Sequence, residues 1–420
     1  MKGHFYKPNC ACPGKKTKKC SCGATWSYIV DVGINPQTGK RKQKKKGGFA
    51  TKGDAERAIA VLIVEVTDGT YSEEKNATFK EFTETWLELY SKSGKIKIST
   101  IRIKKHEISR LMPYFEYAKM KDITRKQYQN ALDDLKTTGY TIKEEDGEIN
   151  KSYADSTLIG IHRTGRLIFK KAVELSIIKK DPTEYAQIPK LQKTVEEVES
   201  EKEVVSHLEK EELALFLDTA RYKGLERDYE IFKTLSYTGM RAGELCALKN
   251  TDIDFVEHRI SITKTYYNPT NNIKEYYLLP PKTKTSIRFI EIDEELINDL
   301  IKLRELQYEK RKEYGARYHD KDFVFAKTEN VNPGYPEYIK MIENRMQRLL
   351  RIAGLNTDLT PHSLRHTHVS LLAEAGVSLQ DIMDRLGHKD DDTTKNVYLH
   401  VTKTKKKDAS MKFSELMKNV

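Results

Sequence analysis

The chain has 420 residues and a formal net charge of +12. This length is too great for one ordinary core and predicts two or three domains, each able to bury its own apolar surface. The sequence contains no apolar run long enough to span a membrane and no apolar signal segment near its N-terminus, so we expect a cytoplasmic protein. These features exclude a membrane-embedded function.

The positive charge is concentrated at the N-terminal end. Residues 1–50 contain twelve Lys or Arg and one acidic residue, Asp31, which gives +11 and leaves +1 for the rest of the chain. A segment of this kind binds polyanions such as DNA with an affinity that depends strongly on salt. The alternative is a solvated basic tail that binds nothing.

Four cysteines lie within this basic segment. They follow the spacing C-x-C-x7-C-x-C and are Cys10, Cys12, Cys20 and Cys22. Disulfides rarely persist in the cytoplasm, and four thiolates this close together could hold one structural zinc ion in a tetrahedral site. The spacing differs from that of common zinc knuckles, so unligated or redox-active thiols are the alternative.

From Thr25 the pattern changes to short strands followed by a helix. Residues 25–34 alternate as a half-buried β-strand does, and NPQTG then predicts a turn. A helical pattern begins near Thr51 and ends near Gly69. The turn leads through a basic run into a further strand, and the run offers the candidate DNA contacts Lys40, Arg41, Lys42, Lys44, Lys45 and Lys46. We therefore expect a small sheet with one covering helix.

A longer helical region begins at Thr78. Its first helix has apolar side chains at helical spacing, at Phe79, Phe82, Trp86, Leu87 and Tyr90. Helical patterns continue as far as Leu175, with one polar interruption, TGYTIKEEDGEIN. We interpret the region as a helical bundle whose core contains these aromatic side chains. After Asp181-Pro182 a polar, acidic stretch without an apolar face predicts a linker, and helices resume near His207.

The motif LTPHSLRH near the C-terminus offers a candidate anion site. Thr360 and Pro361 are typical of a helix start, which places His362 and Arg365 within one helix. Residues three apart are neighbours on a helix surface, so the imidazole and the guanidinium can converge on one anion. The guanidinium fork matches phosphate oxygens, and we therefore predict a phosphate as the target.

A second arginine lies upstream in TGMRAGEL. Gly239 permits a turn before a helix that carries Arg241 and Glu244. Farther along, KTKTSIRFIEID alternates as a strand that is entered from a turn containing Lys282 and Lys284. A lysine on such a turn could reach a leaving oxygen.

Two more candidate groups follow the HxxR helix. His388 comes after Gly387 at the end of the amphipathic segment SLQDIMDRL, and Tyr398, a possible nucleophile, comes ten residues later. Taken alone, an HxxR pair is usually a surface pair and a tyrosine is usually a half-buried anchor, so only the combination of motifs points to chemistry. The remaining polar groups near these motifs are interpreted as packing or structural residues, namely Cys246, His366 and His368.

Taken in order, these motifs resemble those of the tyrosine recombinases, the integrases carried by prophages, conjugative transposons and integrative conjugative elements. The TGxRxGEL motif, the turn lysine, HxxRH, LGH and the final tyrosine span roughly 160 residues in that family's order. The resemblance implies a multidomain α+β fold, with a small sheet-plus-helix arm-binding domain, an all-helical core-binding domain and a mostly helical catalytic domain that contains a small sheet. The implied divisions are a basic Cys-rich segment (1–24), an arm-type DNA-binding domain (25–74), a core-binding domain (76–188), a linker (189–205), a catalytic domain (206–402) and a C-terminal tail (403–420).

The resemblance also implies a mechanism. The family's catalytic roles fall on Arg241, Lys282, His362, Arg365, His388 and Tyr398, with Glu244 in support and Lys284 as the alternative to Lys282. Tyr398 would attack the phosphorus and form a 3′-phosphotyrosyl intermediate, while a lysine protonates the departing 5′ oxygen. Neither ATP nor a metal ion is needed for this chemistry. One departure from the family pattern is that Tyr398 lies about one residue farther from His388 than in the commonest spacing.

The implied partners are double-stranded DNA at core and arm sites and further copies of the chain, as a tetramer on two duplexes. An excisionase or a host DNA-bending protein could assist, and the C-terminal tail could dock in cis or on a neighbouring protomer. Alternatives are an Xer-like resolvase, an enzyme like type IB topoisomerases, and a DNA-binding architectural protein without catalysis. The arm-like N-terminal region argues against the first two.

Overall fold

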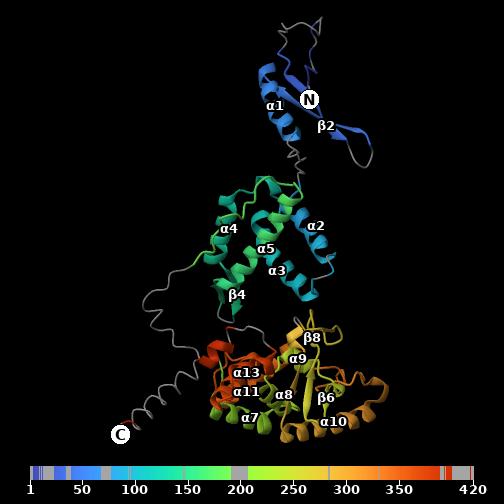
Figure 1. Cartoon of the computed structure of the whole chain (residues 1–420), viewed down its shortest axis with the longest axis vertical. Coiled ribbons are helices and arrows are strands. Elements are labelled where there is room, and N and C mark those ends of the chain that lie inside the picture. Colours follow the sequence, from blue (N-terminus) through green and yellow to red (C-terminus); the bar gives the residue numbers. More distant parts are fainter. Residues whose placement is uncertain are drawn as a thin grey trace. The chain divides into compact units, whose positions relative to one another are not determined.

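The structure is a computed structural model that describes residues 3–8, 10, 12, 23–34, 39–67, 77–92, 94, 96–144, 147–190, 207–281, 284–329, 331–387, 392, 394–399 and 417. The chain divides into two compact units, Met1–Gln192 and Lys193–Val420, and Figure 1 labels several of their elements. Most of the predicted linker and nearly all of the predicted C-terminal tail lie outside the described residues. Within the part of the chain that is described, no helix is both long and apolar enough to cross a bilayer.

The N-terminal part of the first unit is a three-stranded antiparallel sheet covered by one helix. The sheet has the order β1-β2-β3, and its elements are β1 (His4–Tyr6), β2 (Trp26–Ile34), β3 (Arg41–Phe49) and the helix α1 (Lys52–Thr67). Tyr28 and Val30 of β2 pack against Ala55, Ile59 and Leu62 of α1. The predicted strand and helix are confirmed, and β1 is an addition from the segment that the sequence sets apart as Cys-rich.

The start of α1 has a local cause. The Thr51 N–H donates to Asp54 Oδ2 at 3.2 Å, and the Asp54 N–H donates to Thr51 Oγ1 at 3.2 Å. This reciprocal pair satisfies backbone donors that have no partner within the first helical turn. The helix therefore begins where the sequence predicts.

The rest of the first unit is a helical bundle. Its elements are α2 (Phe79–Lys92), α3 (Ile98–Phe115), the short η1 (Met120–Asp122), α4 (Arg125–Thr137) and α5 (Asp155–Glu174). Phe79, Phe82 and Trp86 are buried in its core, as the apolar spacing predicts. The polar interruption is not helical: it forms the antiparallel hairpin of β4 (Tyr140–Glu144) and β5 (Gly147–Lys151).

The second unit is mainly helical and carries two small sheets. Its helices are α7 (Lys210–Lys223), α8 (Asp228–Thr238), α9 (Ala242–Cys246), α10 (Glu294–Tyr314), α11 (Ile339–Ala353), α12 (Pro361–Glu374) and α13 (Leu379–Leu386), with short turns η2 (Asn250–Asp252), η3 (Lys284–Ser286) and η4 (Gly315–Arg317). One sheet has the order β10-β7-β6, and the other pairs β8 with β9. These strands are β6 (Ile253–Asp254), β7 (Arg259–Ile262), β8 (Thr265–Tyr267), β9 (Tyr277–Leu279) and β10 (Arg288–Glu291).

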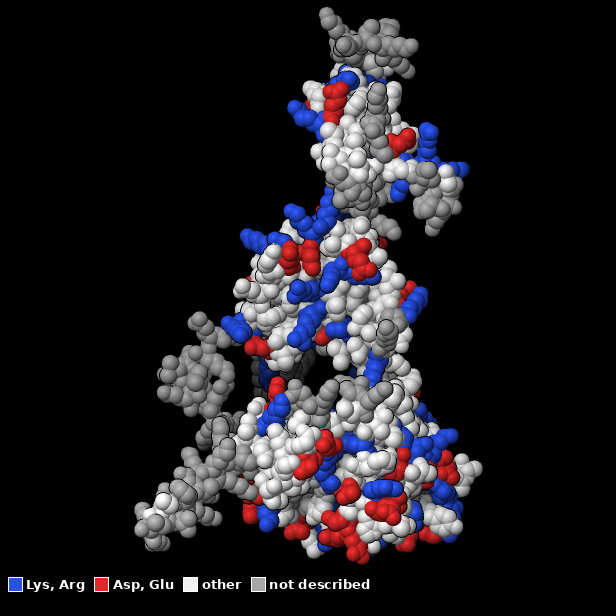
Figure 2. Space-filling view, in the orientation of Figure 1, with Lys and Arg blue, Asp and Glu red and all other residues white. Residues whose placement is uncertain are grey.

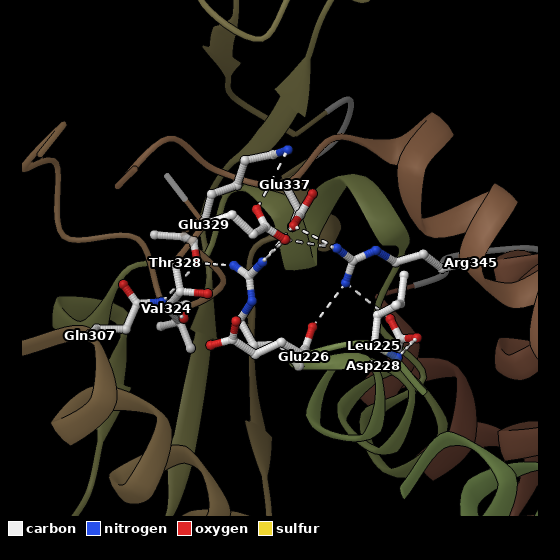
Figure 3. A network of polar contacts seen from close by, with 12 residues as sticks. Leu225, Glu226, Asp228, Gln307, Val324, Thr328, Glu329, Glu337 and Arg345 are labelled. Atoms are coloured by element: carbon white, nitrogen blue, oxygen red, sulfur yellow. Dashed lines mark hydrogen bonds and ion pairs between the residues drawn. The ribbon is translucent and has the colours of Figure 1, made fainter. Parts of the chain in front are cut away.

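A buried ionic cluster joins the turn before α8 to α11 and to the segment between α10 and α11 (Figure 3). Arg227, in the left-handed backbone region at φ 69°, pairs with Glu337 at 2.9 Å and Glu329 at 3.3 Å. Arg345 of α11 pairs with Asp228 at 3.0 Å and Glu329 at 3.3 Å. We refer to these five residues as the Arg227–Arg345 network.

Candidate active site

Arg241 stands at the start of α9, and its side chain is partly exposed. The Arg241 N–H donates to Glu244 Oε2 at 3.0 Å, and Arg241 Nη1 donates to Glu244 Oε1 at 2.9 Å. The Arg241 side chain is 38% exposed, whereas that of Glu244 is 4% exposed. A buried carboxylate thus holds the guanidinium of a partly exposed arginine in place.

The turn that presents Arg241 depends on a glycine. α8 ends at Gly239, which adopts φ 62°. A Cβ at this position would lie 2.7 Å from His368 Cδ2 and 2.8 Å from Leu386 Cδ2. The turn before Arg241 therefore packs directly against α12 and α13, as only a glycine permits.

Arg365 is hydrogen-bonded to the backbone of two other predicted motifs, the one with Arg241 and the one with His388. It is only 2% exposed and lies on α12. Its Nη1 donates to the Gly239 carbonyl oxygen at 2.6 Å, and its Nη2 donates to the Leu386 carbonyl oxygen at 2.7 Å. The first acceptor lies two residues before Arg241 and the second lies two residues before His388, so the structure brings the three motifs together.

His362 lies one turn before Arg365 on the same helix. α12 begins at Pro361 after Thr360, as predicted. His362 is exposed, and its ring meets that of His366 edge-on with 4.8 Å between the ring centroids. The imidazole is therefore accessible to a ligand, whereas Arg365 is buried one turn farther along the helix.

Tyr398 belongs to a short helical stretch, residues 394–399. Its half-buried side chain packs against a cluster of four buried apolar residues from α12 and α13, which are Val369, Ala373, Ile382 and Leu386. The candidate nucleophile thus lies against the two helices that carry His362, Arg365 and the approach to His388.

Lys282 and His388 lie outside the described residues, as does the side chain of Lys284. Their neighbours are described. A Cβ added at Gly387, at the end of α13 with φ 69°, would lie only 2.9 Å from the Thr285 carbonyl oxygen and 3.0 Å from Arg288 Cδ, so there is no room for one. The residue before His388 therefore contacts the turn that follows Lys282.

Glu244 also contacts an arginine that the sequence did not single out. Arg288 of β10 donates through Nη2 to Glu244 Oε2 at 2.8 Å. Burial would raise the pKa of Glu244, but the hydrogen bond and charge of Arg288, together with the backbone N–H and charge of Arg241, hold that pKa below its ordinary value. Glu244 is therefore a carboxylate between two guanidiniums.

Arg385 and His368 hydrogen-bond to each other and to backbone carbonyl groups, and the sequence motifs do not reveal these contacts. His368 Nδ1 lies 2.8 Å from the Ser236 carbonyl oxygen and must donate to it, so Nε2 accepts from Arg385 Nε at 3.1 Å. Burial, and then the charge of Arg385, lower the pKa of His368 to about 3. Arg385 also donates to the Glu291 carbonyl oxygen at 2.9 Å. His368 is thus a neutral structural group, as its interpretation predicted.

One signal in the sequence could have identified Arg288. Along β10, Arg288 and Ile290 are buried while Phe289 and Glu291 are exposed. An arginine in phase with the buried face of a strand needs an acceptor inside the fold. The long-range partners of Arg385 and His368 leave no such periodic signal.

The predicted DNA contacts of the N-terminal region occupy β3 and the residue before it. All six cationic side chains of the run from Lys40 to Lys46 are exposed or half-buried. By contrast, basic and acidic side chains are interspersed over the visible face of the second unit (Figure 2). The placement fits the charge asymmetry of the sequence and leaves β3 accessible to a polyanion.

The cysteine cluster is described only in part. Cys10 and Cys12 are half-buried, whereas Cys20 and Cys22 lie outside the described residues. A search of the described part of the chain finds no group of three or more His, Cys, Asp or Glu side chains placed to hold a metal ion. Cys246 is 1% exposed, and burial raises the pKa of its thiol well above the ordinary value, which agrees with its interpretation as a packing residue.

Comparison with known proteins agrees with this architecture along most of the chain. The phage integrase family matches residues 206–405, an arm DNA-binding domain matches 15–66, and the N-terminal SAM-like domain of phage integrases matches 78–136. The integrase of Staphylococcus phage L54a is 29% identical over 358 residues, covering 82% of this chain and 95% of that protein. The ICEBs1 integrase of Bacillus subtilis is 26% identical, covering 93% of this chain and 97% of that protein.

Solved structures show the same fold. The Tn1549 transposon integrase in complex with transposon right end DNA aligns with a TM-score of 0.57 at 20% identity, covering 77% of this chain and 99% of that one. A lambda integrase dimer bound to a core site aligns with a TM-score of 0.54 at 17% identity, covering 89% of this chain and 92% of that one. The predicted fold class is confirmed.

The fold, the ordered motifs and these matches define a site-specific tyrosine recombinase. The chain belongs to the phage integrase family.

Proposed function

We propose that the chain is the integrase of a mobile genetic element, which cuts and rejoins double-stranded DNA for integration and excision. The observation that carries the proposal is the pair of hydrogen bonds from Arg365 to the carbonyl oxygens of Gly239 and Leu386, which joins the three arginine and histidine motifs at one place. The similarity to integrases from a phage and an integrative element supports the mobile-element origin.

The proposed reaction is an in-line transfer of a phosphodiester. The hydroxyl of Tyr398 attacks the phosphorus, the bond from phosphorus to the 5′ oxygen breaks, and a 3′-phosphotyrosyl bond forms. Arg241 and Arg365 stabilise the negative charge that grows on the non-bridging oxygens in the transition state. A 5′ hydroxyl from the partner strand then reverses the step, so the bond energy is conserved without ATP.

Two protons move in this step. His362 accepts or relays the proton of the Tyr398 hydroxyl, and Lys282, or Lys284 in its place, donates a proton to the departing 5′ oxygen. His388 donates a hydrogen bond to the phosphate. No metal ion takes part in these transfers. Glu244 supports the reaction by holding Arg241, as its two hydrogen bonds to that residue indicate.

The proposed domain division is the one that the sequence predicts, with an arm domain at 25–74, a core-binding domain at 76–188 and a catalytic domain at 206–402. The core-binding and catalytic domains would hold the core site, and the basic strand β3 would contact arm sites. The proposed assembly is a tetramer, by analogy with a lambda integrase tetramer bound to a Holliday junction, which aligns with a TM-score of 0.54. Because DNA is the substrate, we place the enzyme in the cytoplasm, where an excisionase or a DNA-bending protein could assist it.

The test is covalent capture of DNA. The full chain is incubated with a pool of labelled duplexes from element ends, each nicked near the suspected cleavage point, and separated on a denaturing gel. The wild type should give a protein–DNA species whose trapped DNA identifies the site. Tyr398→Phe should bind but form no such species, whereas Tyr222→Phe, at a tyrosine 77% exposed on α7, should react as the wild type does.

Two outcomes would overturn the proposal. Tight binding by the wild type without any covalent species would favour a DNA-binding architectural protein. Relaxation of supercoiled DNA without strand exchange would favour an enzyme like type IB topoisomerases.

We further propose that Cys10, Cys12, Cys20 and Cys22 bind one structural zinc ion, on the strength of their spacing alone. Zinc content measured on the full chain should be close to one ion per chain. It should fall to zero in the Cys10→Ser, Cys12→Ser double variant. Metal-free wild-type protein would contradict this proposal and leave the catalytic one untouched.

A further inference from the structure

We infer that Arg288 is a positioning residue that fixes three catalytic segments relative to one another. The inference rests on the proposed function, because it concerns the residues to which that function assigns roles. The Arg288 side chain is only 5% exposed, so it acts through its neighbours and not by touching DNA.

Each of the partners of Arg288 belongs to a different segment. Besides the bond to Glu244 Oε2 at 2.8 Å, Nη1 donates to Glu244 Oε1 at 3.3 Å and to the Ser286 carbonyl oxygen at 3.2 Å, and Nε donates to the Arg385 carbonyl oxygen at 2.9 Å. Glu244 holds Arg241. Ser286 ends the short turn η3, which begins at Lys284, and Arg385 lies three residues before His388.

The side chain that makes these bonds is itself firmly anchored. β10 pairs with β7 in an antiparallel register that sets Arg288 opposite Ile262 and Ile290 opposite Ile260. Ile260, Ile262 and Ile290 belong to the main core of the second unit. Catalytic groups need support from residues held on rigid elements, and this strand provides that support from inside the fold.

Only arginine suits this position. A guanidinium offers five N–H donors in one plane, which can serve a carboxylate and two carbonyl oxygens at once. A lysine ammonium is a point donor on a flexible stem, and glutamine has a single N–H₂ group. Arg288→Lys should therefore restore the charge beside Glu244 but not all three connections.

The expected consequence of Arg288→Gln is misplacement of both Arg241 and the turn lysine without loss of DNA binding. A displacement of about 1 Å can slow an enzyme by about 100-fold. We expect single-turnover cleavage to fall by about that factor, with an intermediate loss in Arg288→Lys. Binding of the same duplex should stay at the wild-type level.

The experiment uses the cleavage site mapped with the wild type and two versions of that duplex. One is unmodified, and the other has sulfur in place of the bridging 5′ oxygen at the scissile phosphate. A thiolate is a much better leaving group than an alkoxide, since thiols have a pKa near 8.5, so the sulfur duplex needs no general acid. The deficit of Arg288→Gln should therefore shrink by about tenfold or more on the sulfur duplex.

Two arginine controls separate positioning from loss of folding. Arg259→Gln lies on the adjacent strand β7, where the side chain is 46% exposed and pairs with Asp254, and should cleave both duplexes as the wild type does. Arg227→Gln removes a buried arginine from the Arg227–Arg345 network, and any deficit it shows should be equal on the two duplexes.

The inference is overturned if Arg288→Gln cleaves the unmodified duplex at the wild-type rate. It is also overturned if its deficit is the same on both duplexes and follows the unfolded fraction, as that of Arg227→Gln should. A wild type that forms no covalent species with any duplex is a different result, because it overturns the proposed function and this inference together.

Discussion

The second unit contains two clusters of arginines and carboxylates that differ in net charge. The Arg227–Arg345 network has two arginines and three carboxylates, and Lys327 lies 3.9 Å from Glu329, so the formal charge with that lysine included is zero (Figure 3). At the candidate active site, Arg241 and Arg288 share one carboxylate, Glu244, and Arg365 is held by carbonyl oxygens. The formal charge of those four residues is +2. Among the described residues, the cations of the network are matched by carboxylates, whereas the arginines of the candidate active site outnumber theirs, which suits the binding of a phosphate.

The contrast has a physical basis. A buried ion pair gains little net stability because desolvation offsets attraction, but removing one partner leaves an uncompensated charge. A site that stabilises a transition state needs donors that are already in place and not neutralised. Mutations in the Arg227–Arg345 network should therefore mainly lower the free energy of unfolding. Mutations of the active-site arginines should mainly lower the rate of DNA cleavage.

The largest expected effect is on stability, in the Arg227–Arg345 network. Glu337 is fully buried and pairs with Arg227 at 2.9 Å and Arg345 at 3.5 Å. Glu337→Gln removes a charge from between two guanidiniums and should lower the free energy of unfolding by about 3–5 kcal/mol. Chemical denaturation measures this loss, and the folded fraction should still cleave DNA at the wild-type rate.

The matched control is Glu309→Gln on α10, where the glutamate is 67% exposed and pairs with Lys312 at 3.1 Å. An exposed pair contributes at most about 1 kcal/mol, so this variant should unfold almost as the wild type does. A similar stability for both variants would contradict the structural role of the buried network.

The next effect is on rate, at Arg241. Arg241→Lys keeps a positive charge but loses the fork that can bind two phosphate oxygens, so single-turnover cleavage should fall by about 100- to 1000-fold. Because the side chain is 38% exposed, the free energy of unfolding should change by less than about 1 kcal/mol. Cleavage near the wild-type rate, or a loss of stability like that of Glu337→Gln, would refute the assignment.

The sequence predicted the parts of this site that depend on local pattern. The start of α12 followed from Thr360-Pro361, the strand β10 followed from alternation, and the apolar spacing after Thr78 identified α2. Each of these signals lies within a few residues and reflects backbone hydrogen bonding or a single buried face.

The sequence could not predict contacts that depend on tertiary packing. The bonds of Arg288 to Glu244 and Arg385 join residues 44 and 97 positions apart, and no spacing rule relates them. The strand β1 was missed because it is three residues long and pairs with β2 across the cysteine segment. The hairpin of β4 and β5 was missed because its polar residues show no buried face in the sequence.

A smaller loss of stability is expected at two glycines that share the same backbone conformation. Gly239 has φ 62° and Gly354, at the end of α11, has φ 68°. A Cβ at Gly354 would meet nothing within 4 Å, so Gly354→Ala should lose only the cost of a left-handed residue, about 1 kcal/mol. Gly239→Ala also overlaps His368 and Leu386 and should lose about 2–3 kcal/mol in all.

The pair also tests whether the turn serves catalysis. Arg365 donates to the Gly239 carbonyl oxygen, so Gly239→Ala should slow cleavage by the folded fraction, while Gly354→Ala should not. Thermal unfolding and single-turnover cleavage measure the two effects separately. Equal stability and equal cleavage rates for the two variants would show that the close packing of the turn at Gly239 does not contribute to catalysis.

The last prediction is a pH dependence of the free energy of unfolding that comes from His368. Burial, and then the charge of Arg385, lower the pKa of this residue to about 3. Well above pH 6.5 the imidazole is neutral in the folded and unfolded chains alike and adds no pH dependence. As the pH falls through 6.5, His368 takes up a proton in the unfolded chain but stays neutral in the folded chain. The free energy of unfolding therefore decreases as the pH falls toward about 3, with a slope of at most about 1.4 kcal/mol per pH unit. His368→Gln cannot titrate, and the difference in free energy of unfolding between wild type and variant should therefore shrink between pH 6.5 and pH 5. A difference that stays constant over this range would mean that His368 is protonated in the folded chain, in which case its Nε2 could not accept from Arg385.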